Sequence, residues 1–382
     1  MKQNLRIAMV YNGTFEYRTG ILTVIENLTK QYLKAGHQVY NIGFTTGKSQ
    51  KVRGWTLIPG MPLTLAGELK LALTVKKLIK EKDIDIVHFH GGQLLTLFKR
   101  HKIPYIVTNH GLLSKIYAEN AGNDIKKSVF NIIGRYLYRG ADVVTTVSSA
   151  VKDDITNTYR VDPSKIFVIP NGIDDFWLND LPPGKINETR QKLGLADKGP
   201  ILFFLRPAEK RKGLHFLLKS LGEIRGEFPD IRLLVAGQIS DSDYTQEIRQ
   251  LVTELHLDEN VIFLGNVPQK DLPVFYKMAY LTVVPSTYEA FPMVILESYA
   301  CGTPVVAFDA GGVRDIIEDG IDGWIIQWGD SEGLTRIVFD LLSKPDMLKE
   351  MGKRGKEKVK GQYRWSSIAE SYIKVYKLVG NA

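Results

Sequence analysis

Short apolar segments rich in β-branched residues alternate with longer segments of helical periodicity along the whole chain. In the first half, six of them predict strands: residues 5–11, 37–44, 85–90, 104–110, 142–148 and 165–170. Because these segments are apolar throughout, they suit a parallel sheet that is covered on both faces. Helical spacing marks three intervening helices, through Val24, Leu28 and Tyr32, through Leu71, Val75, Leu78 and Ile79, and through Ile125, Val129, Ile132, Ile133 and Tyr136.

The second half of the chain repeats this rhythm. Its predicted strands are residues 200–206, 231–237, 260–265, 281–286 and 304–308. We therefore predict an α/β protein of two doubly wound, Rossmann-like domains that face each other across a cleft. The expected parts are an N-terminal domain (1–178), a Pro- and Gly-rich linker with a short helix (179–199), a C-terminal domain (200–363) and a final helix that crosses back to the first domain (364–382).

Length and composition agree with two globular domains and narrow the range of partners. The chain has 382 residues, 44% of them hydrophobic, and its single cysteine fits a reducing compartment. The first strand begins too early for a signal peptide and no apolar run reaches the ~18 residues of a membrane span, so we expect a cytoplasmic protein. The net charge of +8 favours phosphate esters or an anionic membrane surface. Zinc-finger spacing, RNP-like aromatic residues and a basic tail are all lacking, which argues against nucleic acid.

Two sequence patterns resemble ligand motifs without meeting their requirements. The stretch GFTTGKS (43–49) ends like a P-loop, but that motif needs its first glycine at position 42, which is Ile42. The residues after it do not predict a helix that could receive a phosphate. The D-x-D patterns at 83–85 and 241–243 are better explained as solvated turns than as metal clamps. We expect neither nucleotide hydrolysis nor a metal site.

Histidines and a glycine mark the carboxyl edge of the first predicted sheet. His88 and His90 alternate on one strand face, where packing in the core is a better explanation than metal binding. His110 ends a strand next to a glycine, where it could bind a sugar hydroxyl or a backbone carbonyl, or serve as a cap. Gly20 begins a helix after the first strand and would let a ligand approach the backbone closely.

A pair of cations follows the first strand of the second domain. Arg206 ends the strand, and Lys212 precedes a glycine and a helix six residues later. A planar guanidinium and a point charge at the carboxyl edge of a sheet can clamp a diphosphate. A solvated run of charges is the alternative, because the intervening residues 209–211 are all charged.

Two carboxylates seven residues apart bracket the start of a predicted helix. The helix is expected to begin near Phe291 and Pro292, with the free N–H groups of Met293 and Val294 facing an anion. Glu297 on that helix can accept hydrogen bonds from a vicinal diol such as a ribose, and Glu289 in the preceding loop would reach a sugar beyond the diphosphate. Alternatively, both carboxylates pair with cations of the fold.

The ordered set of motifs resembles the retaining glycosyltransferases of family 4, which have the GT-B fold. It comprises Glu289 and Glu297 with the CGTPVVAFDAGGVRDII segment that follows, RPAEKRKG upstream and NGID at 171–174. The resemblance spans essentially the whole chain and implies a donor that is a nucleoside-diphosphate sugar. It implies that Arg206 and Lys212 bind the diphosphate, Glu297 the ribose and Glu289 the donor sugar. His110 falls near that sugar and Gly20 in the glycine loop of the family.

The chain departs from the family pattern at three positions. Leu205 stands before the clamp arginine where the family usually has glycine, Pro292 lacks an N–H group, and Thr19 replaces a second glycine. None of these changes removes a charged group. We therefore expect a hexosyltransferase-type enzyme that needs no metal or other cofactor.

The sequence also leads to expectations about the acceptor, about membrane binding and about two alternative functions. We expect a glycan or lipid-linked acceptor, in cell-surface glycan or glycolipid synthesis. The amphipathic segments at 69–82 and 125–140 carry basic residues and suggest weak binding to an anionic membrane, on its inner face, although ordinary solvated helices explain them equally well. A 2-epimerase of the same fold and a non-catalytic binder of sugar nucleotides are the alternatives.

Overall fold

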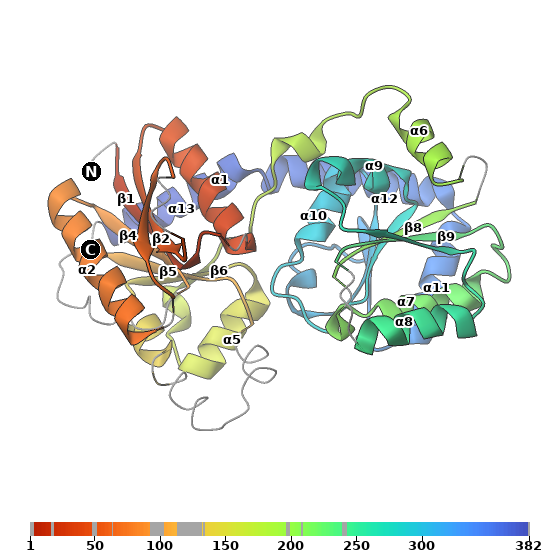
Figure 1. The fold of residues 1–382 in the computed structure, drawn as a ribbon, viewed down its shortest axis with the longest axis horizontal. Coiled ribbons are helices and arrows are strands. Elements are labelled where there is room, and N and C mark those ends of the chain that lie inside the picture. The colour runs from red at the N-terminus through yellow and green to blue at the C-terminus, as the bar shows by residue number, and fades with distance from the viewer. Residues whose placement is uncertain are drawn as a thin grey trace. The chain divides into compact units, whose positions relative to one another are not determined.

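The computed structural model describes residues 4–16, 19–47, 52–62, 64–91, 103–112, 132, 134–195, 199–207, 209–238 and 243–380. The chain divides into two compact units (Figure 1). Unit 1 consists of Met1–Gly172 together with Trp365–Ala382, and unit 2 consists of Ile173–Arg364. The expected cleft between two domains stays a prediction, and each unit is described by itself.

Unit 1 is built on a parallel sheet of seven described strands in the order β3-β2-β1-β4-β5-β6-β7. The strands are β1 (Arg6–Thr14), β2 (Gln38–Thr45), β3 (Trp55–Pro59), β4 (Ile86–His90), β5 (Tyr105–Asn109), β6 (Val143–Thr146) and β7 (Ile166–Val168). Every position of β4, β5 and β6 is buried, as expected for a parallel sheet with both faces covered. The strand order reverses between β1 and β4, which confirms the predicted doubly wound topology.

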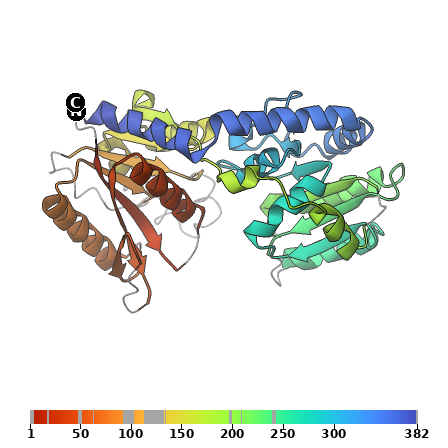
Figure 2. The same cartoon turned by 90° about the horizontal axis from the view of Figure 1, so that it is seen from above.

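The helices of unit 1 bury apolar stripes against this sheet. They are α1 (Gly20–Lys34), α2 (Leu65–Lys82), α5 (Ser149–Tyr159) and α13 (Trp365–Val379). The predicted stripe of α1 is buried, and α13 packs against α1 (Figure 2). Trp365, Tyr372 and Tyr376 of α13 thereby join the core of the N-terminal strands. In the third predicted helix, Ile125, Val129 and Ile133 lie outside the described residues.

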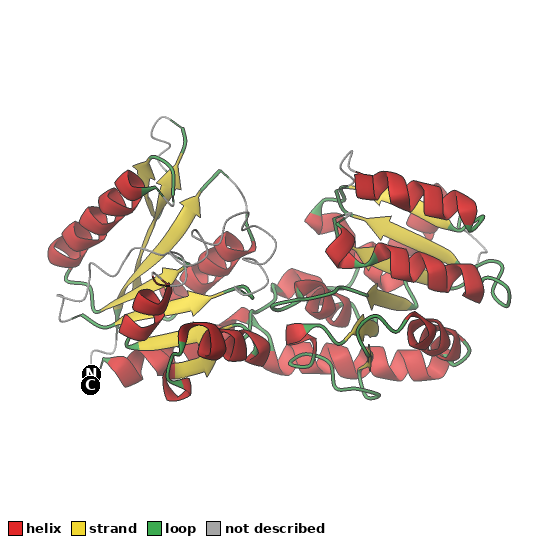
Figure 3. Cartoon of the chain, turned by 90° about the horizontal axis from the view of Figure 1, so that it is seen from below, coloured by secondary structure: helices red, strands yellow, loops and turns green. Residues whose placement is uncertain are grey.

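Unit 2 repeats the design with six parallel strands in the order β10-β9-β8-β11-β12-β13. Helices lie on both sides of the strands in each unit (Figure 3). The strands are β8 (Ile201–Leu205), β9 (Arg232–Ala236), β10 (Val261–Gly265), β11 (Leu281–Val284), β12 (Val305–Phe308) and β13 (Gly323–Ile326). The helices are α6 (Lys185–Lys192), α7 (Leu214–Ile224), α8 (Asp243–Glu254), α9 (Leu272–Met278), α10 (Met293–Ala300), α11 (Ser331–Leu342) and α12 (Pro345–Gln362).

Two strands were not predicted from the sequence, and both lie at a sheet edge. Strand β3 ends the sheet of unit 1 beside β2, and β13 ends the sheet of unit 2 beside β12. Strand β3 is interrupted by Thr56 and ends at Pro59, and β13 has only three consecutive apolar residues, so neither has the long apolar run of the predicted strands. The pattern used to find the other strands therefore does not detect them.

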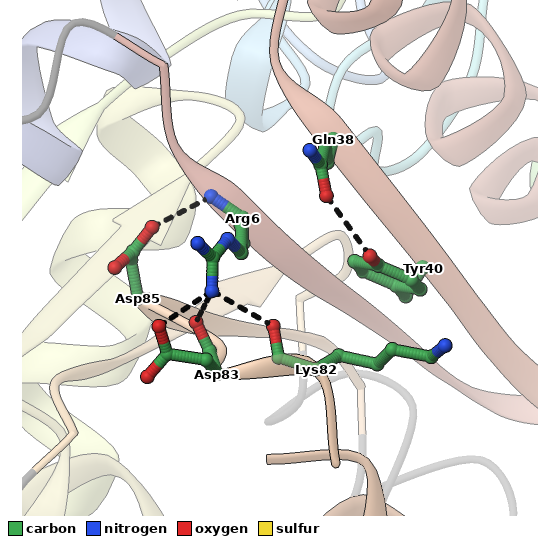
Figure 4. Close-up of polar contacts among 6 residues, drawn as sticks. All are labelled: Arg6, Gln38, Tyr40, Lys82, Asp83 and Asp85. Atoms are coloured by element: carbon green, nitrogen blue, oxygen red, sulfur yellow. Dashed lines mark hydrogen bonds and ion pairs between the residues drawn. The ribbon is translucent and has the colours of Figure 1, made fainter. Parts of the chain in front are cut away.

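The D-x-D pattern at 83–85 serves the structure of unit 1 (Figure 4). Asp85 Oδ2 accepts a hydrogen bond from the Arg6 backbone N–H at 2.8 Å, and Asp83 forms an ion pair with the Arg6 guanidinium. Asp83 also ends α2 in the left-handed conformation, with φ of 51°. Asp83 thus connects the end of α2 to Arg6, the first residue of β1. Asp85, which directly precedes β4, connects the start of that strand to the same residue. Beside them, the Tyr40 hydroxyl donates to Gln38 Oε1 at 3.0 Å.

Among the helices that the structure describes, none combines the length and apolar character needed to cross a lipid bilayer. Helix α2, which contains the whole of the first basic amphipathic segment (69–82), exposes Leu69 and Leu73 beside its lysines. In the second such segment, 125–140, residues 125–131 and 133 lie outside the described residues.

Candidate functional site

The predicted cation clamp lies where the strand order of unit 2 reverses. Strands β8 and β11 are neighbours in the sheet, although about 75 residues of chain separate them. Arg206 follows β8 directly, and Glu289 lies in the loop between β11 and α10. Lys212 ends a short 3-10 turn, Lys210–Lys212, that leads into α7. Ligands of doubly wound sheets bind at this topological switch point, beyond the carboxyl ends of the strands.

The two cations share one buried carboxylate. Lys212 Nζ lies 2.8 Å from Glu289 Oε1, and Arg206 Nη2 lies 3.3 Å from the same oxygen. The Lys212 and Glu289 side chains are almost fully buried, and that of Arg206 is 12% exposed. Within the described residues, the buried Nε and Nη2 atoms of Arg206 have no hydrogen-bond acceptor of good geometry. The cluster thus contains two positive charges, one negative charge and unused donors, which is suited to an additional anion.

The protonation of the cluster follows from its burial and its charges. Burial alone would raise the pKa of Glu289, but Arg206 and Lys212 outweigh it and hold this pKa below its usual value, with a further contribution from the Ser286 hydroxyl. Burial, together with the charge of Arg206, lowers the pKa of Lys212 to about 8, and Glu289 opposes this shift. Both groups are therefore mainly charged at neutral pH.

A glycine keeps the loops of the clamp in close contact. Gly213 adopts φ of 76°, and a Cβ atom there would lie 1.9 Å from the Pro285 carbonyl oxygen. The Thr287 N–H donates to the Arg211 carbonyl at 2.8 Å and joins the same two loops. The turn that carries Lys212 is thus fixed against the loop that leads to Glu289.

Glu297 projects from the second turn of α10 and is surrounded by protein, although part of its side chain is exposed. Its Oε2 accepts a hydrogen bond from the Tyr276 hydroxyl of α9 at 2.9 Å. Burial raises the pKa of Glu297 to about 7, against the smaller lowering effects of Tyr276 and Arg206. Of the two carboxylates, only Glu289 forms ion pairs with cations among the described residues.

Helix α10 begins one residue later than the predicted Pro292. Pro292 is the N-cap, because its ψ of 95° is not helical, and Met293 is the first helical residue. Met293 and Val294 remain in the first turn, where backbone N–H groups have no partner within the helix. The buried Phe291 precedes them, with its ring 6.2 Å from that of Tyr363.

In unit 1, Gly20 is the first residue of α1. The hydroxyl of the N-cap Thr19 accepts from the Leu22 N–H at 3.3 Å and also contacts the Tyr11 hydroxyl at 2.8 Å. A Cβ atom on Gly20 would meet no atom within 4 Å. The packing of the protein therefore does not require a glycine here, whereas the close approach of a ligand would.

His110 follows β5 at the carboxyl edge of the unit 1 sheet and contacts the end of β4. Its Nε2 lies 3.0 Å from His90 Nδ1, and the two ring planes are inclined by only 21°, with centroids 5.3 Å apart. Burial lowers the pKa of His110 to about 4, so it is neutral at physiological pH. Both nitrogens of His88 contact hydroxyl groups, of Tyr376 at 2.6 Å and of Thr108 at 2.5 Å, as expected for a core histidine.

Several partners of these residues were not predicted from the sequence. Tyr276 comes from a different helix than Glu297, and the contact of His90 with His110 joins the last residue of β4 to the residue after β5. The alternation of His88 and His90 identified their strand face but could not place His110 beside it. In the described ranges, no three His, Cys, Asp or Glu side chains form a group that could hold a metal ion.

Comparison with known proteins places both units in one family. Residues 18–175 match the model described as Glycosyltransferase Family 4, and residues 185–358 match the model described as Glycosyl transferases group 1. The chain is 30% identical to alpha-maltose-1-phosphate synthase of Mycolicibacterium smegmatis, over 77% of this chain and 79% of that protein. The chain belongs to glycosyltransferase family 4. As a glycosyltransferase of this family, it also resembles the GDP-mannose-dependent alpha-(1-6)-phosphatidylinositol monomannoside mannosyltransferase of the same organism, at 28% identity over 82% of this chain and 81% of the relative.

Solved structures identify the fold of this glycosyltransferase as GT-B. HepE of Anabaena, solved in complex with UDP, superimposes with a TM-score of 0.81 over 98% of this chain and 100% of HepE, at 20% identity. The predicted family and fold are thereby confirmed, as is glycosyl transfer as the activity. The roles of the individual site residues of this glycosyltransferase stay predictions.

Proposed function

We propose that this glycosyltransferase transfers a hexosyl group from a nucleoside-diphosphate sugar to its acceptor with retention of the anomeric configuration. The observation that carries the proposal is the cluster of Arg206, Lys212 and Glu289 at the switch point of unit 2. A buried site with two cations and one carboxylate has a net charge of +1 and donors without acceptors. A diphosphate supplies the missing acceptors and negative charge.

In the proposed complex, the parts of the donor follow one another along the site. Arg206 and Lys212 bind the diphosphate, and the first turn of α10, with Met293 and Val294 after Phe291, adds backbone N–H groups and the positive end of the helix dipole. Glu297 accepts hydrogen bonds from the ribose diol. These roles are supported by the positions of all six residues near the same strand ends in unit 2.

Glu289, Gly20 and His110 are assigned to the donor sugar and its surroundings. Glu289 already contacts both cations through Oε1, and we assign its carboxylate to the sugar hydroxyls next to the diphosphate. Gly20 leaves room at the start of α1, and His110 offers a neutral imidazole from unit 1. A neutral imidazole can exchange hydrogen bonds with a hydroxyl without adding charge.

The chemical step needs stabilisation of the leaving nucleoside diphosphate. Negative charge grows on it as the bond to the sugar breaks, and preorganised cations stabilise that charge more strongly than they stabilise the bound donor. Arg206 and Lys212 are held in place by Glu289, so little reorganisation is required. We therefore propose catalysis by Arg206, Lys212, Glu289 and His110 without a metal ion or other cofactor.

The acceptor is proposed to be a glycan or a lipid-linked saccharide in cell-surface glycan or glycolipid synthesis. The exposed Leu69 and Leu73 of α2 lie among lysines, which supports weak attachment to an anionic membrane. We therefore propose a cytoplasmic enzyme that binds peripherally to the inner face of the membrane.

The donor is tested by a thermal-shift screen with UDP-, GDP- and ADP-sugars, because a ligand of the folded state raises the melting temperature. The donor found is then incubated with candidate acceptors, and the products are analysed by NMR. We expect a new glycoside with the anomeric configuration of the donor. An inverted product would refute retention, while a new sugar nucleotide formed without acceptor would identify an epimerase.

A further inference from the structure

His90 is a buried histidine to which the proposed reaction assigns no role. It ends β4 and is 1% exposed. Its ring packs against that of His88, with centroids 4.0 Å apart and the planes tilted by 37°, and His88 is held by the hydroxyls of Tyr376 and Thr108. The His90 ring is therefore fixed from one side by the core of unit 1, and its Nδ1 lies 3.0 Å from Nε2 of the candidate catalytic His110.

The hydrogen bond between the two rings needs one donor and one acceptor. Burial lowers the pKa of His90 well below its usual value and that of His110 to about 4, so both rings are neutral and each carries one proton. The proton between them resides either on His90 Nδ1 or on His110 Nε2. The two arrangements differ at the other two ring nitrogens, His90 Nε2 and His110 Nδ1. In each arrangement one of these nitrogens carries a proton and the other does not.

The surroundings of His90 Nε2 discriminate between these arrangements. This atom is buried and has no hydrogen-bond partner among the residues that the structure describes. If His110 donated, His90 would carry its proton on Nε2, and a buried N–H group would lack an acceptor, which is rare in proteins. If His90 donates from Nδ1, its Nε2 has no proton, and no N–H group is left unpaired.

We propose that His90 is a positioning residue that fixes His110 as the tautomer protonated on Nδ1. His110 then accepts from His90 through Nε2 and presents an N–H donor through Nδ1, which has no other partner among the described residues. The consequence for the ligand rests on the proposed function: His110 donates a hydrogen bond to an oxygen of the donor sugar or acceptor and is not a general base. The tautomer itself does not depend on that function.

The tautomer is measured directly on the full-length free protein by long-range ¹H–¹⁵N NMR of labelled histidines. The chain has seven histidines, and the signals of His110 are assigned by their loss in His110→Gln. We expect His110 in the wild type to be protonated on Nδ1. Protonation on Nε2, or an averaged tautomer, would overturn the proposal. This result does not depend on turnover, so it stands or fails separately from the proposed function.

Variants of His90 test whether this residue determines the tautomer of His110. His90→Leu removes the donor, and the fixed Nδ1–H signal of His110 should be replaced by Nε2–H or by an average. His90→Asn places an amide near the position of Nδ1 and should restore the wild-type tautomer. His256→Asn is the matched control, because His256 is exposed in unit 2 and has φ of 52°, which asparagine tolerates. An unchanged His110 tautomer in His90→Leu would refute the assignment.

The expected kinetics follow from the role of His110 as a hydrogen-bond donor to the substrate. In His90→Leu, kcat should fall roughly fivefold to tenfold, the equivalent of about one hydrogen bond, while the affinity for nucleoside diphosphate is unchanged. His90→Asn should recover most of that loss. If kcat and nucleoside diphosphate affinity fell together, His90 would have a general structural role and not a positioning one.

Discussion

Burial of the Glu297 carboxyl couples donor recognition to stability. Its pKa is raised from 4.5 to about 7, so the unfolded chain releases this proton at a lower pH than the folded protein. The stability from this group is fully present below about pH 4.5 and is lost as the pH rises to about 7. Glu297→Gln keeps an acceptor for Tyr276 and cannot ionise. We expect it to raise the free energy of unfolding at pH 8 by about 1–3 kcal/mol and to weaken nucleoside diphosphate binding at least about tenfold.

Urea denaturation at pH 4 and pH 8, with calorimetric titration of the nucleotide at pH 8, measures both effects. The gain in stability should be much smaller at pH 4. Glu223→Gln, at an exposed position of α7, is the control and should change neither quantity. A variant that binds nucleotide as tightly as the wild type would remove Glu297 from the ribose site.

Arg206 and Lys212 should contribute more to turnover than to donor binding. The charge on the diphosphate grows as the bond to the sugar breaks, so loss of either cation is expected to lower kcat by about 10²–10³ and to raise KM far less. The double variant should lose less than the sum of the single losses, because both cations act on one group. Added Mg²⁺ should not restore activity.

Steady-state kinetics of Arg206→Ala and Lys212→Ala test this expectation. Lys210→Ala is the matched control, since Lys210 lies in the same turn but its side chain is 74% exposed. It should retain wild-type kinetics. If kcat of the folded Arg206 or Lys212 variants stayed within about threefold of the wild type, these residues would not form the clamp.

The polar residues of the site were predictable because their position in the chain reveals their position in the fold. Arg206 and His110 follow apolar strands, and parallel strands end at one edge of a sheet. The sequence cannot show which side chains meet there. Glu289 was expected to contact a sugar, yet in the protein it already joins both cations, and Tyr276 reaches Glu297 from another helix. Such contacts depend on tertiary packing, which has no signature in local spacing.

The 3-10 turn before α7 shows how one glycine determines the position of a loop. Gly213→Ala would combine φ of 76° with a Cβ only 1.9 Å from the Pro285 carbonyl oxygen. We expect it to destabilise unit 2 by about 2–4 kcal/mol and to abolish nucleotide binding, because Lys212 must move away from Glu289. Gly184→Ala has a similar φ of 77° without any atom within 4 Å, and should cost about 1 kcal/mol and leave binding intact.

Urea denaturation and nucleotide titration of these two variants distinguish backbone strain from steric overlap. Equal destabilisation by both substitutions would mean that the loop of Pro285 moves away from the added Cβ at little cost in free energy. In that case Gly213 would serve only the turn and would not fix the clamp.

The length of the apolar run in each strand explains which strands could be predicted from the sequence. Strand β8 is apolar at every position, and the sequence reveals it directly. Strand β3 is interrupted by Thr56, and β13 has only three apolar residues after Gly323, so neither run is long enough to be distinguished from a loop. The start of α10 was misplaced by one residue, because proline is compatible with both the N-cap and the first helical position.

The proposed attachment to membranes is a property of the charge of the whole molecule. With a net charge of +8 and with Leu69 and Leu73 exposed on α2, the protein should sediment with anionic vesicles at low salt. Binding should weaken as salt screens the charges and should be absent with neutral vesicles. Leu69→Ser with Leu73→Ser should reduce it, while Leu378→Ser, at another exposed leucine in unit 1, is the control. Failure to bind, or binding insensitive to salt, would contradict the proposal.

The two ends of the chain together complete unit 1, and this has a consequence for biosynthesis. Trp365, Tyr372 and Tyr376 of α13 fill the core formed by β1 and α1, and all of unit 2 lies between these segments in the sequence. On the ribosome, unit 2 has its full sequence before α13 is made. We expect a chain that ends at Arg364 to resist protease across unit 2 but not across unit 1. Intact unit 1 in that truncated chain would contradict this order. Strand β1 and helix α1 are therefore made before unit 2 but become native after it.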